Sequence, residues 1–158
     1  MKLSPAPFFM LQSASSDSYT ALSALYEATG GQQWSSKQNW LDGEPCTKSW
    51  YGVSCNSGEI GITLGTVVEG GKGYGNNLVG SIPTQFGLLS KLTAVQLESN
   101  LLTNSLPTEI GLFTGLYTSF YVIYNGLTGV RHRPVANSFR FVHVCAVWSG
   151  PPFLLQTD

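Results

Sequence analysis

The chain has 158 residues, the size of one ordinary domain. Hydrophobic residues make up 42% of the sequence but charged residues only 11%, whereas a typical soluble domain is about a quarter charged. This composition excludes a disordered polyelectrolyte, and eight lysines and arginines are too few for a nucleic-acid-binding face. The sequence also contains no run of about 18 apolar residues that would span a membrane.

The first 16 residues have the outline of a secretory signal peptide. Lys2 precedes a short apolar patch at residues 8–11, and small residues follow at 13–16. Pro5 and Pro7 leave only a very short apolar core, so an untethered tail remains the alternative.

A helix is predicted over residues 18–29, with Asp17 as its N-cap and two glycines at 30 and 31 as its end. Its apolar residues recur at helical spacing: Tyr19, Leu22, Leu25 and Tyr26. Trp34, Trp40 and Trp50 follow at irregular spacing, and we expect the three rings to form a small local core.

The middle of the sequence contains an internal repeat with an offset of 24 residues. The segment N-x-L-x-G-x-I-P from Asn76 to Pro83 recurs as N-x-L-x-N-x-L-P from Asn100 to Pro107. A third copy around Asn125 carries one inserted residue and stops after position 129. The apolar positions before the second asparagine are Leu89, Leu92, Val95 and Leu97.

This spacing has a physical explanation. A short strand directs alternate side chains such as Val95 and Leu97 inward, and no single coil can bury its own apolar face, so coils must stack. The asparagine after the strand can satisfy backbone groups in a tight turn. Ile60, Ile62 and Leu64 look like the first strand, but a glycine-rich run at 70–75 follows, so we expect an irregular, looped first turn. That run also lacks the phosphate-loop motifs.

The L-x-G-x-I-P form of the repeat resembles the plant-type leucine-rich repeat family. The stretch C-x-x-x-W-Y-G-V-x-C, from Cys46 to Cys55, resembles the N-terminal cap of that family. The resemblance covers about residues 17–129. It implies an α/β solenoid: a short right-handed leucine-rich repeat coil with a helical, disulfide-linked N-terminal cap.

The resemblance also implies a function. Members of this kind are ectodomains of receptor-like kinases, receptor-like proteins and polygalacturonase-inhibitor-like proteins, which bind proteins, peptides or glycans. We therefore expect a non-catalytic recognition module with a protein, peptide or glycan ligand, and with a co-receptor as a further candidate partner. The alternative is a truncated structural or surface-coat protein, or a gene-model fragment without an independent function.

The same resemblance implies a disulfide between Cys46 and Cys55, with two free thiols in a reducing compartment as the alternative. A disulfide indicates an oxidising compartment, so we expect a secreted or cell-surface location. Cys145 remains as the odd cysteine. The spacing of cysteines and histidines matches no zinc site, and no metal, cofactor or catalytic residue is expected.

The strand positions between the inward residues are expected to face the concave surface of the solenoid. The predicted ligand-binding residues are Gln96 and Glu98 in the second repeat, and Tyr121 and Ile123 in the third. A simple solvated face is the alternative for Gln96 and Glu98. For Tyr121 the alternative is a core position, if the inserted residue shifts the register.

The composition changes near residue 129. Residues 17–129 carry a net charge of −4, whereas residues 130–158 carry +2 and all three arginines. Within this tail, residues 139–148 are apolar and β-prone. They either cover the last repeat or belong to sequence unrelated to the fold, as in a frame-shifted gene.

The expected organisation has four parts: a signal peptide or tail at 1–16, an N-terminal cap at 17–58, about two and a half repeats at 59–129, and an atypical tail at 130–158. Because a solenoid of so few repeats is short, we expect marginal stability, with thermal unfolding below about 60 °C.

Overall fold

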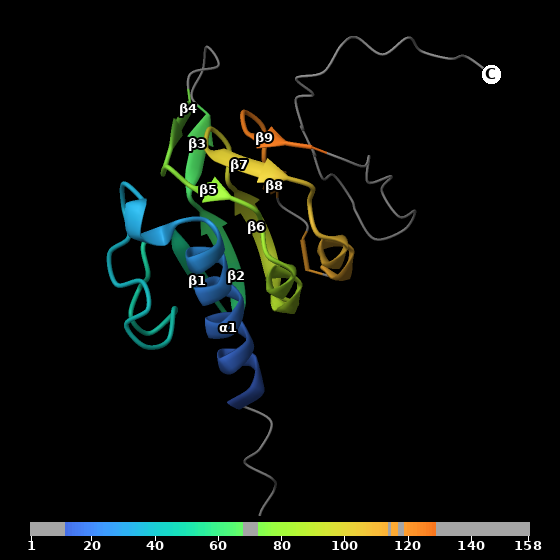
Figure 1. Cartoon of the computed structure of the whole chain (residues 1–158). Helices are drawn as coiled ribbons and strands as arrows, with labels where there is room; N and C mark the ends of the chain where they lie inside the picture. The colour runs from blue at the N-terminus through green and yellow to red at the C-terminus, as the bar shows by residue number, and fades with distance from the viewer. Residues whose placement is uncertain (1–11, 68–72, 114, 117–118, 129–158) are drawn as a thin grey trace, which may run out of the picture.

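The coil unit of the structure is a short strand that turns into a second short strand and returns through a 3₁₀ helix (Figure 1). The computed structural model describes residues 12–67, 73–113, 115–116 and 119–128. Helix α1 (Gln12–Ala28) precedes the coils, followed by the short 3₁₀ helix η1 (Gly31–Gln33). Two further 3₁₀ helices, η2 (Thr84–Leu88) and η3 (Thr108–Leu112), close successive coils.

The strands form two sheets that run through successive coils, and a separate hairpin. The main sheet contains, in order, β1 (Val53–Asn56), β2 (Glu59–Thr63), β6 (Leu92–Gln96) and β8 (Ser119–Tyr121). Its first pair is antiparallel and the others are parallel. The second sheet contains the parallel strands β5 (Val79–Gly80), β7 (Leu101–Asn104) and β9 (Gly126–Leu127). The hairpin pairs β3 (Gly65–Val67) with β4 (Gly73–Gly75).

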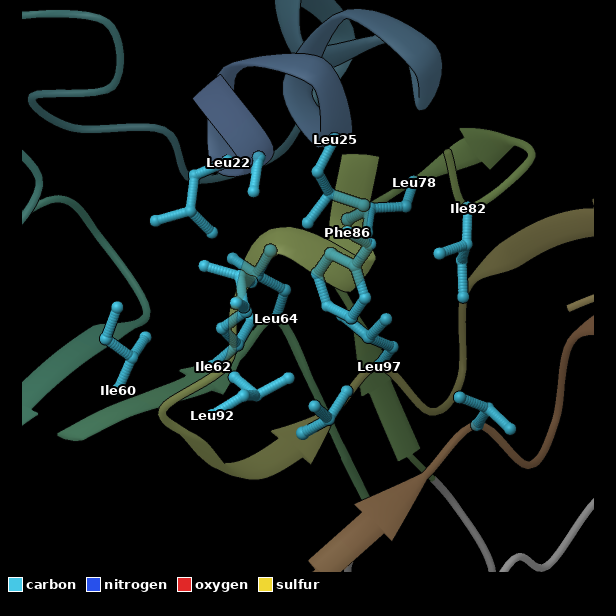
Figure 2. Close-up of a cluster of buried hydrophobic side chains, with 14 of the residues drawn as sticks. Leu22, Leu25, Ile60, Ile62, Leu64, Leu78, Ile82, Phe86, Leu92 and Leu97 are labelled. Carbon is cyan, nitrogen blue, oxygen red and sulfur yellow. The ribbon is translucent and has the colours of Figure 1, made fainter. Parts of the chain in front are cut away.

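Alternation along the main-sheet strands builds the core as the repeat predicts. Buried residues in these strands or directly after them come from each coil: Ile60, Ile62 and Leu64 from the first, Leu92, Val95 and Leu97 from the second, and Phe120 and Val122 from the third. Figure 2 shows Leu22 and Leu25 of α1 facing these strands across Phe86. The helix therefore buries its apolar stripe against the first coils.

Helix α1 starts earlier than the sequence pattern predicts. It begins at Gln12, so Asp17 lies inside the helix and is not its N-cap. The expected boundary between residues 16 and 17 falls within this helix, and residues 1–11 of the expected signal peptide lie outside the described residues. The predicted end is confirmed, because Gly30 follows the helix with a left-handed φ of 67°.

The three tryptophans form the local core that their spacing suggests. Trp34, Trp40 and Trp50 are 3%, 8% and 1% exposed. The ring centroids of Trp34 and Trp40 are 4.7 Å apart, and those of Trp40 and Trp50 are 4.8 Å apart. Tyr19 and Tyr26 of α1 pack on the same cluster. Aromatic contacts thus join the helix to the loop that leads to β1.

Three asparagines form a ladder that ties the coils together. The Asn100 amide nitrogen donates to the carbonyl of Leu64 at 2.9 Å and that of Leu97 at 3.0 Å, while its Oδ1 accepts from the Asn76 and Leu78 backbone N–H groups. The side chain of Asn125 repeats the arrangement one coil on, donating to Leu97 at 2.9 Å. These turns have no sheet partner for their backbone groups, so the amides supply one.

The first coil contains an inserted hairpin. Leu64 and Leu97 occupy equivalent places beside one another, 33 positions apart, whereas Asn76 and Asn100 are only 24 apart. The extra nine residues are accommodated by β3, β4 and their connection, and Figure 1 shows this hairpin beyond one end of β2. The expected irregular first turn is confirmed and has a defined form.

The glycines of the hairpin allow it to lie directly on the next coil. An ideal Cβ on Gly65 would fall 1.9 Å from the carbonyl oxygen of Glu98, and one on Gly75 would fall 1.7 Å from that of Ser99. No side chain fits at such distances. Gly65 and Gly75 therefore have a packing role in this fold.

Candidate ligand-binding face

The face of the main sheet turned away from the core carries a row of uncharged polar side chains. The parallel register sets Thr63 beside Gln96, and Gln96 beside Tyr121. The Thr63 hydroxyl donates to the Gln96 Oε1 at 3.0 Å, which orients the amide. We call Thr63, Gln96 and Tyr121 the outer row. It crosses three strands, so each coil contributes one side chain to a common surface.

The register resolves the alternative for Tyr121. Phe120 and Val122, on either side of it, are 1% and 2% exposed and lie in the core. Tyr121 is half-buried and shares the outer face with Gln96. The inserted residue of the third repeat thus does not move Tyr121 into the core, because Phe120 pairs with Val95 and Tyr121 pairs with Gln96 in the β6–β8 ladder.

Next to the outer row lie small side chains. Gly61 pairs with Ala94, and Ala94 pairs with Ser119. An ideal Cβ on Gly61 would lie 2.5 Å from the Ser54 hydroxyl of the neighbouring strand. The aromatic ring and the amide of the outer row therefore stand beside a part of the sheet that carries small side chains.

The structure corrects the expected exposure of Glu98. This side chain is only 4% exposed, although it alternates with the inward residues as predicted. The backbone of Gly65 in the inserted hairpin lies against the backbone of Glu98, a contact that the predicted irregular first turn did not specify. Among the described residues, Glu98 Oε2 has no hydrogen-bond partner. Burial raises the pKa of the Glu98 carboxyl, while a backbone hydrogen bond opposes part of the effect.

Ile123 lies where the strand leaves the main sheet. It is half-buried, and its carbonyl accepts a hydrogen bond from the Ser99 N–H at 3.0 Å. Of the four predicted ligand-binding residues, the structure thus sets Gln96 and Tyr121 side by side on the outer face, leaves Ile123 partly exposed at its end, and buries Glu98. A ligand role for any of the four remains a prediction.

Two surface residues were missed by the sequence pattern. Thr63 could have been found, since it alternates with Ile62 and Leu64, but the first repeat was not registered against the second. Tyr74 of β4 is 75% exposed, and no repeat position predicts it because it belongs to the insertion.

The disulfide between Cys46 and Cys55 is present, with a Cα–Cα distance of 5.7 Å. It links the tryptophan-rich loop to β1, and both cysteines are exposed. Within the described ranges no group of three or more acidic, histidine or cysteine side chains is placed to hold a metal. In the same ranges, no helix has the length and apolar character that crossing a membrane requires.

The chain is similar in sequence to plant leucine-rich repeat receptor-like kinases. No protein-family model matches the chain. It is 41% identical over 93 residues to the LRR receptor-like serine/threonine-protein kinase GSO2 of Arabidopsis thaliana, covering 58% of this chain and 7% of that protein. It is 28% identical over 83 residues to a probable leucine-rich repeat receptor-like protein kinase of the same plant, covering 52% and 8%. The chain thus spans less than a tenth of either relative.

Two solved structures align with most of this chain. The crystal structure of PEPR1–AtPEP1 aligns with a TM-score of 0.54 at 18% identity, over 70% of this chain and 15% of that one. The LRR ectodomain of the receptor kinase SOBIR1 from Arabidopsis thaliana aligns with a TM-score of 0.43 at 21% identity, over 71% and 68%. The repeat motif and the stacked coils show a leucine-rich repeat fold, and the chain is similar over part of its length to curated plant receptor-like kinases.

Proposed function

We propose that this chain is a non-catalytic, extracellular recognition module of a receptor-like protein, which binds a protein, peptide or glycan ligand through the outer face of the main sheet. The observation that carries the proposal is the outer row. Thr63, Gln96 and Tyr121 come from three successive coils and form one uncharged surface with an aromatic ring and an oriented amide. Aromatic side chains with neighbouring hydrogen-bonding groups are frequent anchors of recognition surfaces.

Two further features support this proposal. The curated relatives are receptor-like kinases, and the solved PEPR1 structure is a complex with AtPEP1. The exposed Cys46–Cys55 disulfide suits an oxidising compartment.

In this proposal residues 17–58 act as the N-terminal cap of a right-handed coil formed by residues 59–129. Helix α1 and the tryptophan cluster cover the side of the first coil that has no preceding coil, and β1 adds an antiparallel strand to the free edge of β2. Coverage of an open edge prevents pairing with another chain.

The test is a binding screen followed by matched substitutions. The purified, oxidised chain is applied to an array of plant peptides and cell-wall oligosaccharides, and the affinity of each binder is measured by calorimetry. We expect Tyr121→Ala and Gln96→Ala each to weaken binding by about tenfold, which corresponds to ~1.4 kcal/mol.

Leu112→Ala is the matched control, because Leu112 is exposed on η3, away from the main sheet. A binder whose affinity is unchanged by both outer-row substitutions, or is weakened equally by Leu112→Ala, would overturn the proposal.

A further inference from the structure

A second surface lies on the second sheet, separate from the outer row. Val79 and Leu101 are paired across β5 and β7, and they are 48% and 58% exposed. Tyr124, which is 47% exposed, lies in the turn that precedes β9. Two hydrogen bonds hold that turn beside Leu101: Ser99 N–H donates to the Ile123 carbonyl at 3.0 Å, and Leu102 N–H to the Asn125 side chain at 2.9 Å.

These three residues form what we call the apolar stripe: Val79, Leu101 and Tyr124. One member comes from each coil, so the stripe runs across the strands of the second sheet. Its first end is fixed near α1, because Val79 N–H donates to the Thr29 carbonyl at 3.0 Å. Its other end lies beside β9, the last described strand. Exposure of a row of large apolar side chains to water is unfavourable, and such a row is typical of an interaction surface.

We propose that residues 139–148 of the same chain cover the apolar stripe. Eight of these ten residues are apolar, and phenylalanine, valine and tryptophan among them favour extended structure. Removing the apolar surface of this segment from water is favourable, as it is for the stripe.

Residues 139–148 are the favoured occupant of the apolar stripe because they follow β9 closely along the chain. The described chain ends at Thr128, directly after β9, and residue 139 is eleven positions further on. Eleven extended residues reach about 36 Å. The stripe crosses three strands and so extends only about 10 Å, given a strand spacing of ~4.8 Å. A tethered segment within reach competes at an effective concentration that a free partner rarely attains.

Charge favours the same pairing. Residues 130–158 carry a net charge of +2, and residues 17–129 carry −4. The attraction between the two parts is long-ranged and unspecific, so it assists the approach of the segment while apolar contact selects the stripe.

Cys145 lies within the proposed segment and supplies an internal probe for the test. In the full chain, Leu101→Cys introduces a thiol into the stripe, and Leu112→Cys introduces one at a comparably exposed leucine on η3, 58% against 63% exposed. After mild oxidation, peptide mapping by mass spectrometry measures the disulfide between the introduced thiol and Cys145. An intact Cys46–Cys55 linkage in the same map, with an unchanged circular dichroism spectrum, shows that each variant is folded.

We expect the Leu101→Cys chain to form this internal disulfide in about tenfold higher yield than the Leu112→Cys chain. A second readout uses Leu101→Glu, which should raise the alkylation rate of Cys145 severalfold, whereas Leu112→Glu should leave it unchanged. The proposal is overturned if the Leu101 variants match their Leu112 counterparts in both measurements. It is also overturned if the disulfide forms only between two chains, which would make a second copy the occupant.

Discussion

Glu98 illustrates how one side chain can follow the predicted alternation and still have an unpredicted environment. It points away from the core, as its place between Leu97 and Ser99 implies, but it is 4% exposed and one carboxyl oxygen has no partner among the described residues. Removal from water disfavours the ionised form, so the pKa of the folded carboxyl lies above its ordinary value of 4.5. The folded state therefore binds the proton more tightly than the unfolded state.

We predict that Glu98→Gln stabilises the protein at neutral pH, because it removes a buried ionised group. Because the pKa of Glu98 is raised in the folded state, its contribution to the free energy of unfolding is fully present below pH 4.5. This contribution is lost as the pH rises through the folded pKa and the buried carboxyl ionises. The advantage of Glu98→Gln should therefore shrink towards pH 4. Urea unfolding between pH 4 and pH 8 measures it.

Glu27→Gln on the exposed side of α1 is the control for a general loss of negative charge. Parallel stability curves for Glu98→Gln and the unchanged protein over this pH range would show that the carboxyl is not penalised by burial.

Another single-residue contrast concerns Gly80 and Asn104, which occupy the same place in two repeats. Both have positive φ, 114° for Gly80 and 63° for Asn104. Only at Gly80 does the backbone approach α1, where a Cβ would lie 2.4 Å from the Ala28 carbonyl oxygen. Asparagine tolerates the left-handed conformation, so the second repeat can depart from the pattern without breaking the turn.

At the scale of elements, the inserted hairpin decides the shape of the first coil. Its glycines Gly65 and Gly75 lie against the backbone of Glu98 and Ser99. The asparagine ladder is maintained across the insertion, since Asn100 still bonds to Leu64 on one side of it and to Asn76 on the other. The hairpin is thus packed as part of the coil.

We predict that Gly75→Ala lowers the free energy of unfolding by about 2 kcal/mol, as expected when an added methyl overpacks a tight contact. The new Cβ would lie 1.7 Å from the Ser99 carbonyl oxygen, so the hairpin or the turn must move. Denaturant unfolding measures the loss.

Gly111→Ala is the matched control, because an ideal Cβ at Gly111 has no heavy atom within 4 Å. It should change stability by no more than about 0.5 kcal/mol. Equal stabilities for the two alanine variants would contradict the packing role of the hairpin glycines.

For the whole molecule, stability depends on how a short stack of coils is held at its N-terminal side. Local contacts between coils are repeated only a few times, so each end matters more than in a long solenoid. Three features hold the first coil: the packing of α1, the tryptophan cluster and the Cys46–Cys55 disulfide. The disulfide joins the loop to an edge strand that would otherwise be held by β2 alone.

We predict that the double variant Cys46→Ser and Cys55→Ser loses about 2–3 kcal/mol of stability, because the unfolded chain regains the entropy of the closed loop. Thermal unfolding followed by circular dichroism, with and without reducing agent, measures the loss. Cys145→Ser provides the control for cysteine removal as such. Unchanged melting of the double variant would show that the tryptophan cluster holds the loop without the disulfide.

Much of the fold could be predicted because its rules are local. The two-residue alternation of Ile60, Ile62 and Leu64, and the 24-residue offset between asparagines, report directly on which side chains a coil must bury. The tryptophan cluster followed from the size of its rings, and the disulfide from the resemblance of the stretch around Cys46 and Cys55.

Sequence alone thus determined the repeat, its core residues, the two strands that carry Gln96 and Tyr121, and the family that they resemble. Only the tertiary structure decided three contacts between segments. These are the hairpin against Glu98, the register that keeps Tyr121 on the outer face, and the pairing of Leu101 with Val79. The physical reason is that periodicity reports on burial within one coil. The contact between Gly65 of the insertion and Glu98 of the next coil joins residues 33 positions apart, and no local pattern encodes it.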